Sequence, residues 1–124
     1  MIVLVVDDND KNLRLARSAL RYAGIETVGA TTGEEALAAA FEHLPDVVLM
    51  DIRLPDMDGT EAARALKADA RTARIPVVAL TSFAMKGDRE RFLAAGFDGY
   101  IEKPISVREF PGQVRGYCSP TPGS

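Results

Sequence analysis

Polar side chains that could bind a cation or a phosphate follow short apolar runs of this chain. They are Asp7, Asp8, Asp51, Thr81 and Lys103. A short unbroken apolar run is typical of a strand that is buried on both faces of a parallel sheet. The carboxyl ends of parallel strands meet at one edge, where ligands bind in open α/β folds. We therefore expect these five side chains to form one site.

The residue types at this edge indicate phosphate chemistry. Three carboxylates placed together repel one another unless a cation lies between them. Mg²⁺ is a suitable cation, because it is held by a few carboxylates together with water and phosphate oxygens. An aspartate can attack phosphorus to form an acyl phosphate, and a lysine and a hydroxyl can contact the phosphoryl oxygens. The pattern predicts phosphoryl transfer to Asp51, assisted by Lys103 and Thr81.

The patterning of apolar residues predicts five strands that alternate with five helices. Strands are expected at 2–6, 26–30, 47–51, 76–80 and 99–102. Helices are expected at 12–23, 33–44, 59–68, 86–95 and from 107 onward. Thr32 and Asp58 are the expected caps of the second and third helices. Because crossovers are right-handed, we predict an α/β fold, a doubly wound five-stranded parallel sheet of flavodoxin-like order 2-1-3-4-5.

The last helix contains a conflict. Ser106 and Glu109 form a capping pair that predicts a start at Val107. Pro111 would then lie inside the helix at a cost of about 3 kcal/mol, because proline lacks an amide donor and clashes with the preceding turn. We expect a kink or a restart near Pro111, and we expect leucine at this position to stabilise the domain.

Length and composition exclude several classes of function. The chain has 124 residues, of which 47% are hydrophobic, and this suits one domain with a real core. We expect the domain to span 1–118 and a disordered tail to occupy 119–124. The net charge of −3 and the scattered basic residues do not indicate nucleic-acid binding. The single cysteine, Cys118, and the shortness of the apolar runs predict a cytoplasmic protein that does not insert into membranes.

Four motifs, taken together, resemble a response-regulator receiver domain. They are Val-Val-Asp-Asp at 5–8, Leu-Met-Asp-Ile-Arg-Leu-Pro-Asp-Met-Asp-Gly at 49–59, Leu-Thr-Ser at 80–82 and Lys-Pro at 103–104. The resemblance covers nearly the whole chain, from Ile2 to about Cys118. The stretches 81–88 and 103–107 are similar to those of single-domain cell-division regulators of the DivK type.

This resemblance implies a phosphoacceptor response regulator of a two-component system or phosphorelay, without an output domain, rather than a classical enzyme. Asp51 would accept a phosphoryl group from a histidine kinase or a histidine phosphotransfer protein, with Mg²⁺ as cofactor. Asp8, Asp51 and the backbone carbonyl of Arg53 would bind Mg²⁺ directly, and Asp7 would bind it through water. Arg53 and Phe83 occupy positions that tune dephosphorylation in this family. The domain would catalyse its own phosphorylation and dephosphorylation.

The resemblance also implies how the signal is passed on. Thr81 and Tyr100 would be a switch pair, in which the hydroxyl moves to the phosphoryl group and the ring turns inward. Lys103 would contact the phosphoryl group, and its bond to Pro104 is expected to be cis. The result would be a changed binding surface for a downstream protein.

Three other hypotheses compete with this one. An aspartyl-phosphate hydrolase acting on a small substrate would need a water-activating base, for which the sequence offers no candidate. A pseudo-receiver that binds partners without phosphorylation is disfavoured, because every acidic and basic residue of the site is present. A receiver excised from a hybrid kinase would have the same sequence features as a natural single domain.

Overall fold

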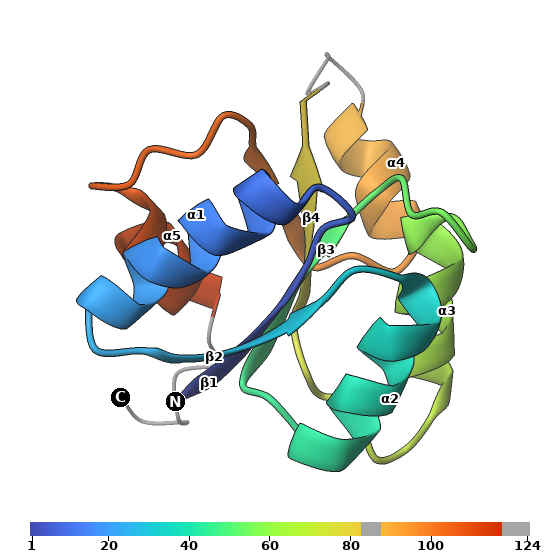
Figure 1. Ribbon diagram of the computed structural model, residues 1–124. Helices are drawn as coiled ribbons and strands as arrows, with labels where there is room; N and C mark the ends of the chain where they lie inside the picture. The colour runs from blue at the N-terminus through green and yellow to red at the C-terminus, as the bar shows by residue number, and fades with distance from the viewer. Residues whose placement is uncertain (83–87, 118–124) are drawn as a thin grey trace.

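The computed structural model describes residues 1–82 and 88–117. A parallel sheet lies at the centre, and its strand order is β2-β1-β3-β4-β5 (Figure 1). The strands are β1 (Ile2–Val6), β2 (Glu26–Ala30), β3 (Val47–Asp51), β4 (Val77–Thr81) and β5 (Gly99–Glu102). The order and the parallel pairing of the strands confirm the predicted doubly wound fold.

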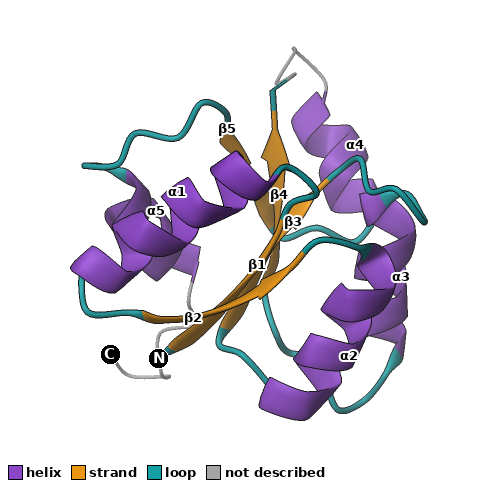
Figure 2. Ribbon diagram, viewed as in Figure 1, coloured by secondary structure: helices purple, strands orange, loops and turns teal. Residues whose placement is uncertain are grey.

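Helices cover both faces of the sheet. They are α1 (Asp10–Tyr22), α2 (Gly33–His43), α3 (Gly59–Ala68), α4 (Asp88–Ala94) and α5 (Phe110–Tyr117). Figure 2 shows α1 and α5 on one face and α2, α3 and α4 on the other. None of the helices in the described part of the chain has the length and apolarity needed to span a bilayer. The expected start of the fourth helix at Lys86, Cys118 and the expected tail lie outside the described residues.

Alternation along the strands divides the core into two clusters. Leu4, Val48 and Ala79 belong to the cluster beneath α2, α3 and α4. The next residues along the same strands, including Leu49 and Leu80, belong to the cluster beneath α1 and α5. The central strands are therefore buried on both faces, which explains their unbroken apolar sequences.

Two helix starts agree with the predicted caps. The side chain of Thr32 accepts a hydrogen bond from the amide of Glu35 at 3.0 Å, and α2 begins at the next residue. The side chain of Asp58 accepts one from the amide of Thr60 at 2.9 Å and caps α3 in the same way. Polar side chains before the apolar faces thus set where these helices begin.

The start of α1 and the end of α2 differ from the prediction. Helix α1 begins at Asp10, earlier than expected, because Asn9 caps it by accepting a hydrogen bond from the amide of Asn12. Leu44 was expected on the inner face of α2, but it lies just past the end of that helix, with a left-handed φ of 45°. Its side chain is 55% exposed and contributes little to the core.

The last helix begins at Phe110, so the predicted start at Val107 is wrong. The amides of Glu109 and Phe110 donate to the carbonyl of Ser106 at 3.1 and 2.8 Å, which forms a turn ahead of the helix. Pro111 is then the second residue of α5, where a helix has no internal partner for an amide and proline is accommodated. The expected kink or restart is not found: a turn at 107–109 leads into a single helix that begins at Phe110, next to Pro111.

Candidate functional site

The carboxyl ends of the strands bring the five predicted side chains together around one open cleft. Asp7 and Asp8 follow β1, Asp51 ends β3, Thr81 ends β4 and Lys103 follows β5. All five line a cleft of about 380 Å³. The prediction that they share one edge of the sheet is therefore confirmed by the fold.

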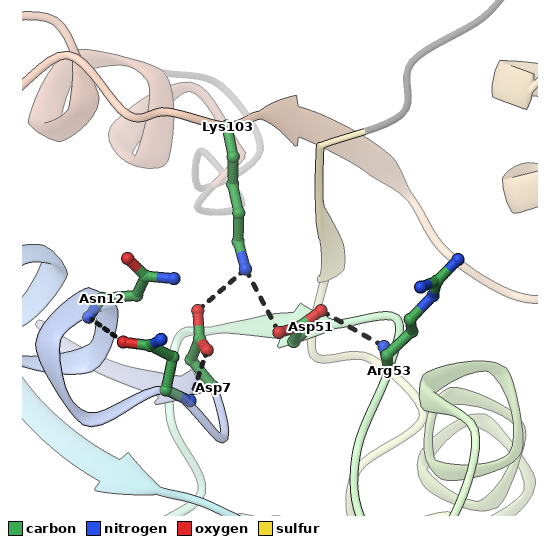
Figure 3. A network of polar contacts seen from close by, with 6 residues as sticks. Asp7, Asn12, Asp51, Arg53 and Lys103 are labelled. Atoms are coloured by element: carbon green, nitrogen blue, oxygen red, sulfur yellow. Dashed lines mark hydrogen bonds and ion pairs between the residues drawn. The ribbon is translucent and has the colours of Figure 1, made fainter.

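An ammonium group lies between two of the carboxylates. Nζ of Lys103 is 2.9 Å from Oδ2 of Asp7 and 3.1 Å from Oδ2 of Asp51 (Figure 3). The exposed fractions of these side chains are 16% for Lys103, 3% for Asp7 and 14% for Asp51. Because water screens them so little, each charge depends on the others for stabilisation. The bond between Lys103 and Pro104 is cis, as predicted.

Burial and charge act in opposite directions on these groups. Burial raises the pKa of the Asp51 carboxyl, and the nearby Lys103 ammonium opposes only part of that shift. Burial by itself would lower the pKa of Lys103, but its bond to Asp7 and the charges of both carboxylates raise that pKa above its ordinary value. Lys103 is therefore a cation at neutral pH, and an ionised Asp51 would be stabilised by a further cation.

The loop after β3 holds the second oxygen of Asp51. Oδ1 of Asp51 accepts a hydrogen bond from the amide of Arg53 at 3.2 Å. Arg53 also pairs with Asp58 in an isolated antiparallel bridge, and the amide of Gly59 donates to the carbonyl of Ile52 at 2.7 Å. A Cβ atom on Gly59 would overlap the carbonyl oxygen of Asp51, so only glycine permits this tight turn. The loop is thus folded back against the end of its strand.

The acidic trio of Asp7, Asp8 and Asp51 fits a hard divalent cation. Each residue offers one carboxylate oxygen, and these three oxygens lie within 4.8 Å of one another. An all-oxygen donor set of this kind suits Mg²⁺. Asp8 is exposed, so the trio is open to solvent on that side. Both oxygens of Asp7 already have partners, Lys103 and the amide of Asn9, which favours a contact through water.

The predicted switch residues lie on the face of the sheet that α4 covers. Thr81 is 6% exposed and lines the cleft. Tyr100 pairs in register with Ala79, which precedes Thr81 on the same face of β4. The ring of Tyr100 is half-buried, and its centroid is 6.0 Å from that of Phe92 in α4. A movement of Tyr100 would therefore change its contact with Phe92 and so affect α4.

Several residues of the site region could not be singled out from the sequence. Asn12 of α1 and Arg91 of α4 line the cleft. Both occupy exposed helical positions, where polar side chains are ordinary and give no signal. Asp56, in the loop after β3, binds the start of α2. Phe83, which the resemblance placed near the site, lies outside the described residues.

The family model of the response regulator receiver domain matches residues 3–115. The chain belongs to this family. The polar-differentiation response regulator DivK of Brucella ovis is 46% identical over 115 residues, which cover 93% of this chain and 94% of DivK. The predicted family and the predicted likeness to DivK are both confirmed. Membership of the receiver family makes the chain a signalling domain rather than a classical enzyme.

Solved structures of receivers have the same fold. A chemotaxis response regulator of Vibrio cholerae matches with a TM-score of 0.88 at 28% identity, over 94% of this chain and 97% of that one. The receiver domain of a sensor histidine kinase from Pseudomonas aeruginosa PAO1 matches with a TM-score of 0.85 at 34% identity, over 94% and 96%. That structure has a magnesium ion coordinated in its active-site cleft.

Proposed function

We propose that Asp51 accepts a phosphoryl group from a histidine of a kinase or of a phosphotransfer protein. The observation that carries this proposal is the position of the Asp51 carboxylate in an open cleft, between the ammonium of Lys103 and the amide of Arg53. Partial burial leaves this carboxylate less solvated than one on the surface, which favours its attack on phosphorus.

The transfer step uses groups that are already in place. One carboxylate oxygen of Asp51 forms a bond to phosphorus while the bond from phosphorus to the histidine nitrogen breaks. The electron pair of the broken bond stays on the imidazole. Lys103 is placed to neutralise charge on the phosphoryl oxygens, and the hydroxyl of Thr81 supplies a hydrogen bond from β4. The amide of Arg53 keeps Asp51 oriented.

We expect Mg²⁺ to be held by Asp8, Asp51 and the backbone carbonyl of Arg53, with Asp7 acting through water. When bound, Mg²⁺ supplies positive charge that offsets the charge of the phosphoryl oxygens. The oxygen set of the acidic trio and the magnesium ion in the cleft of the Pseudomonas receiver support this assignment.

Phosphorylation then changes a protein-binding surface through Thr81 and Tyr100. The partners of the domain are a histidine kinase or phosphotransfer protein and a downstream protein, all in the cytoplasm. The domain also hydrolyses its own acyl phosphate.

Tyrosine fluorescence tests the switch. The chain has three tyrosines and no tryptophan, so replacing Tyr22 and Tyr117 by phenylalanine leaves Tyr100 as the only fluorescent side chain of these two types. Phosphorylation should change the fluorescence of Tyr100, and Thr81→Ala should abolish the change. An unchanged Tyr100 signal in the phosphorylated protein would contradict the switch.

Intact-protein mass spectrometry tests the phosphoacceptor. With Mg²⁺ and acetyl phosphate, the wild-type protein should gain one phosphoryl group, and Asp51→Asn should gain none. Asp46→Asn is the control, because Asp46 binds the amide of Ile2 at the opposite edge of the sheet. Equal labelling of the wild type and Asp51→Asn would overturn the assignment. Phosphotransfer from purified histidine kinases and phosphotransfer proteins then identifies the donor.

A further inference from the structure

The carboxylate of Asp56 joins the loop after β3 to the start of α2. Its Oδ1 accepts a hydrogen bond from the amide of Gly33 at 2.7 Å, and its Oδ2 accepts one from the amide of Glu34 at 2.9 Å. These are the first two amides of α2, which have no partner within the helix. The two amide bonds lower the pKa of Asp56, so its carboxyl is ionised at neutral pH.

Helix α2 also has caps of its own. Thr32 binds the third amide, that of Glu35, at 3.0 Å. The side chain of Glu35 in turn accepts hydrogen bonds from the amide and the hydroxyl of Thr31, both at 2.8 Å. Helices α1 and α3 have local caps too, at Asn9 and Asp58. Asp56 lies 23 positions after Gly33 and 22 after Glu34, so its bonds also attach the start of α2 to a loop that is distant in the sequence.

An apolar contact accompanies these bonds. The side chain of Met57 lies directly over Gly33, where an added Cβ would overlap it. Met57 is half-buried and packs against the core cluster beneath α2, α3 and α4. In Figure 1, α2 and α3 run side by side on this face of the sheet. The loop is thus attached to α2 by a carboxylate and by an apolar side chain at adjacent positions.

The same loop carries groups of the site. Arg53 donates its amide to Asp51, and its carbonyl is the backbone ligand proposed for Mg²⁺. The bridge between Arg53 and Asp58 joins the two ends of the loop. Asp56 and Met57 fix the part between those ends. The position of the Arg53 carbonyl therefore depends on the attachment of the loop to α2.

We propose that Asp56 is a positioning residue for the phosphoacceptor site, which binds the first two amides of α2 and so holds the loop 52–58 with the Arg53 carbonyl available to the acidic trio. This inference rests on the proposed function. The coupling is reciprocal: a cation bound by that carbonyl stabilises the loop, and with it the bonds from Asp56 to the amides of Gly33 and Glu34.

The first test compares Asp56→Ala with Asp46→Ala. Asp46 is also exposed and accepts a backbone hydrogen bond, from the amide of Ile2 at 2.7 Å, but it lies at the opposite edge of the sheet. Both variants should melt at a lower temperature in EDTA. Calorimetric titration should show a Kd for Mg²⁺ raised about tenfold in Asp56→Ala, as for other groups that orient metal ligands. Asp46→Ala should keep the wild-type Kd.

The second test acts on the loop from outside it. Gly33→Ala leaves every residue of the loop unchanged but displaces Met57. It should also weaken Mg²⁺ binding. Gly112→Ala in α5 is the matched control, because a Cβ there would meet nothing within 4 Å. Wild-type affinity in both Asp56→Ala and Gly33→Ala, or equal losses in these variants and their controls, would overturn the inference.

Amide hydrogen exchange supplies a measurement that a general loss of stability would not change in the same way. In the wild type, Mg²⁺ should slow exchange at Gly33 and Glu34 more than at Glu35, whose amide is bound locally by Thr32. Asp56→Ala should abolish the difference. A wild type that neither binds Mg²⁺ nor is labelled at Asp51 would contradict the proposed function and this inference together. Normal binding and labelling with unchanged exchange at these amides would contradict the inference alone.

Discussion

Lys103 and Asp51 approach to 3.1 Å, although 52 positions separate them in the chain. Strand β4 lies between the strands that carry them, so the lysine side chain reaches across β4 to β3. There it also meets Asp7, which follows β1. One flexible cation thus joins three strand ends, and it does so where solvent gives little screening. The stability of this edge and its chemistry therefore depend on the same group.

Removing this cation should destabilise the metal-free protein. Lys103→Met keeps the apolar stem but leaves the carboxylates of Asp7 and Asp51 buried without their ammonium partner. We expect a loss of about 2 kcal/mol in the free energy of unfolding, measured with urea in EDTA. Lys11→Met, at an exposed position of α1, should have little effect. The double variant with Asp51→Asn should recover part of the loss. A Lys103→Met protein as stable as the wild type would contradict the expectation.

The raised pKa of Asp51 predicts a pH dependence of stability. In the unfolded chain this carboxyl titrates near a pKa of about 3.9, whereas in the native protein burial raises its pKa. The native state then holds the proton to higher pH, so stability decreases as pH rises from about 3.9 through the native pKa, and the deficit remains at neutral pH.

Asp51→Asn should therefore be more stable than the wild type in EDTA at pH 7, and its advantage should shrink as pH falls through the raised native pKa toward about 3.9, where the deficit of the wild type disappears. Thermal unfolding of both proteins from pH 3 to 7 checks this. Arg71 holds the pKa of Asp69 at about 2, an effect of opposite sign that is present in both proteins and cancels in the difference. A stability difference between Asp51→Asn and the wild type that does not vary with pH would show that Asp51 is not the titrating group.

The sequence was sufficient to predict the fold and the placement of most residues of the candidate site, because both depend on buried parallel strands. Strands β1, β3 and β4 have unbroken apolar sequences, and the parallel arrangement alone brings Asp7, Asp51 and Lys103 to one edge. Asp56 could not be predicted in this way. Its partners are backbone amides far away in the chain. Every residue except proline has such an amide, so the sequence does not indicate which ones Asp56 binds.

The start of α5 shows a different limit. Ser106 and Glu109 were expected to cap a helix, and the amide of Glu109 does turn back to the Ser106 carbonyl. The helix nevertheless begins at Phe110, whose side chain is fully buried. Pro111 cannot continue a helix started earlier, so proline geometry and the burial of Phe110 decide the boundary over the capping pair.

The acidic trio predicts how the protein responds to a metal. Asp8→Asn removes one of three crowded carboxylates, so the melting temperature in EDTA should rise by a few degrees. The same change removes a proposed Mg²⁺ ligand, so the stabilisation that Mg²⁺ gives to the wild type should be lost. Melting curves with and without Mg²⁺ measure both effects. A lower melting temperature of Asp8→Asn in EDTA, or an unchanged stabilisation by Mg²⁺, would show that the trio is not a metal site.

A close contact at the sheet edge predicts a steric effect. The ring of Tyr117 in α5 lies over Gly99 of β5, where an added Cβ would overlap it, and its hydroxyl donates to the carbonyl of Tyr100 at 3.3 Å. Gly99→Ala should therefore cost about 1–3 kcal/mol of stability, as overpacking does. Gly116→Ala should not, because a Cβ there would meet nothing within 4 Å. Equal urea midpoints for the two variants would contradict the packing argument.

Pro111→Leu should destabilise the domain, which reverses the sign expected from the sequence. That expectation placed Pro111 inside a helix, whereas it is the buried second residue of α5. There its fixed φ restricts the unfolded chain without straining the native one, an effect of about 0.4–1 kcal/mol. Leucine is also larger than the site it would fill.

Pro111→Ala separates these two effects, since it loses the restriction without overpacking, and it should be the milder variant. Labelling of Asp51 should be unchanged in both, because Pro111 lies outside the cleft lining. Urea unfolding in which either variant exceeds the wild type in stability would show that the proline strains the helix after all.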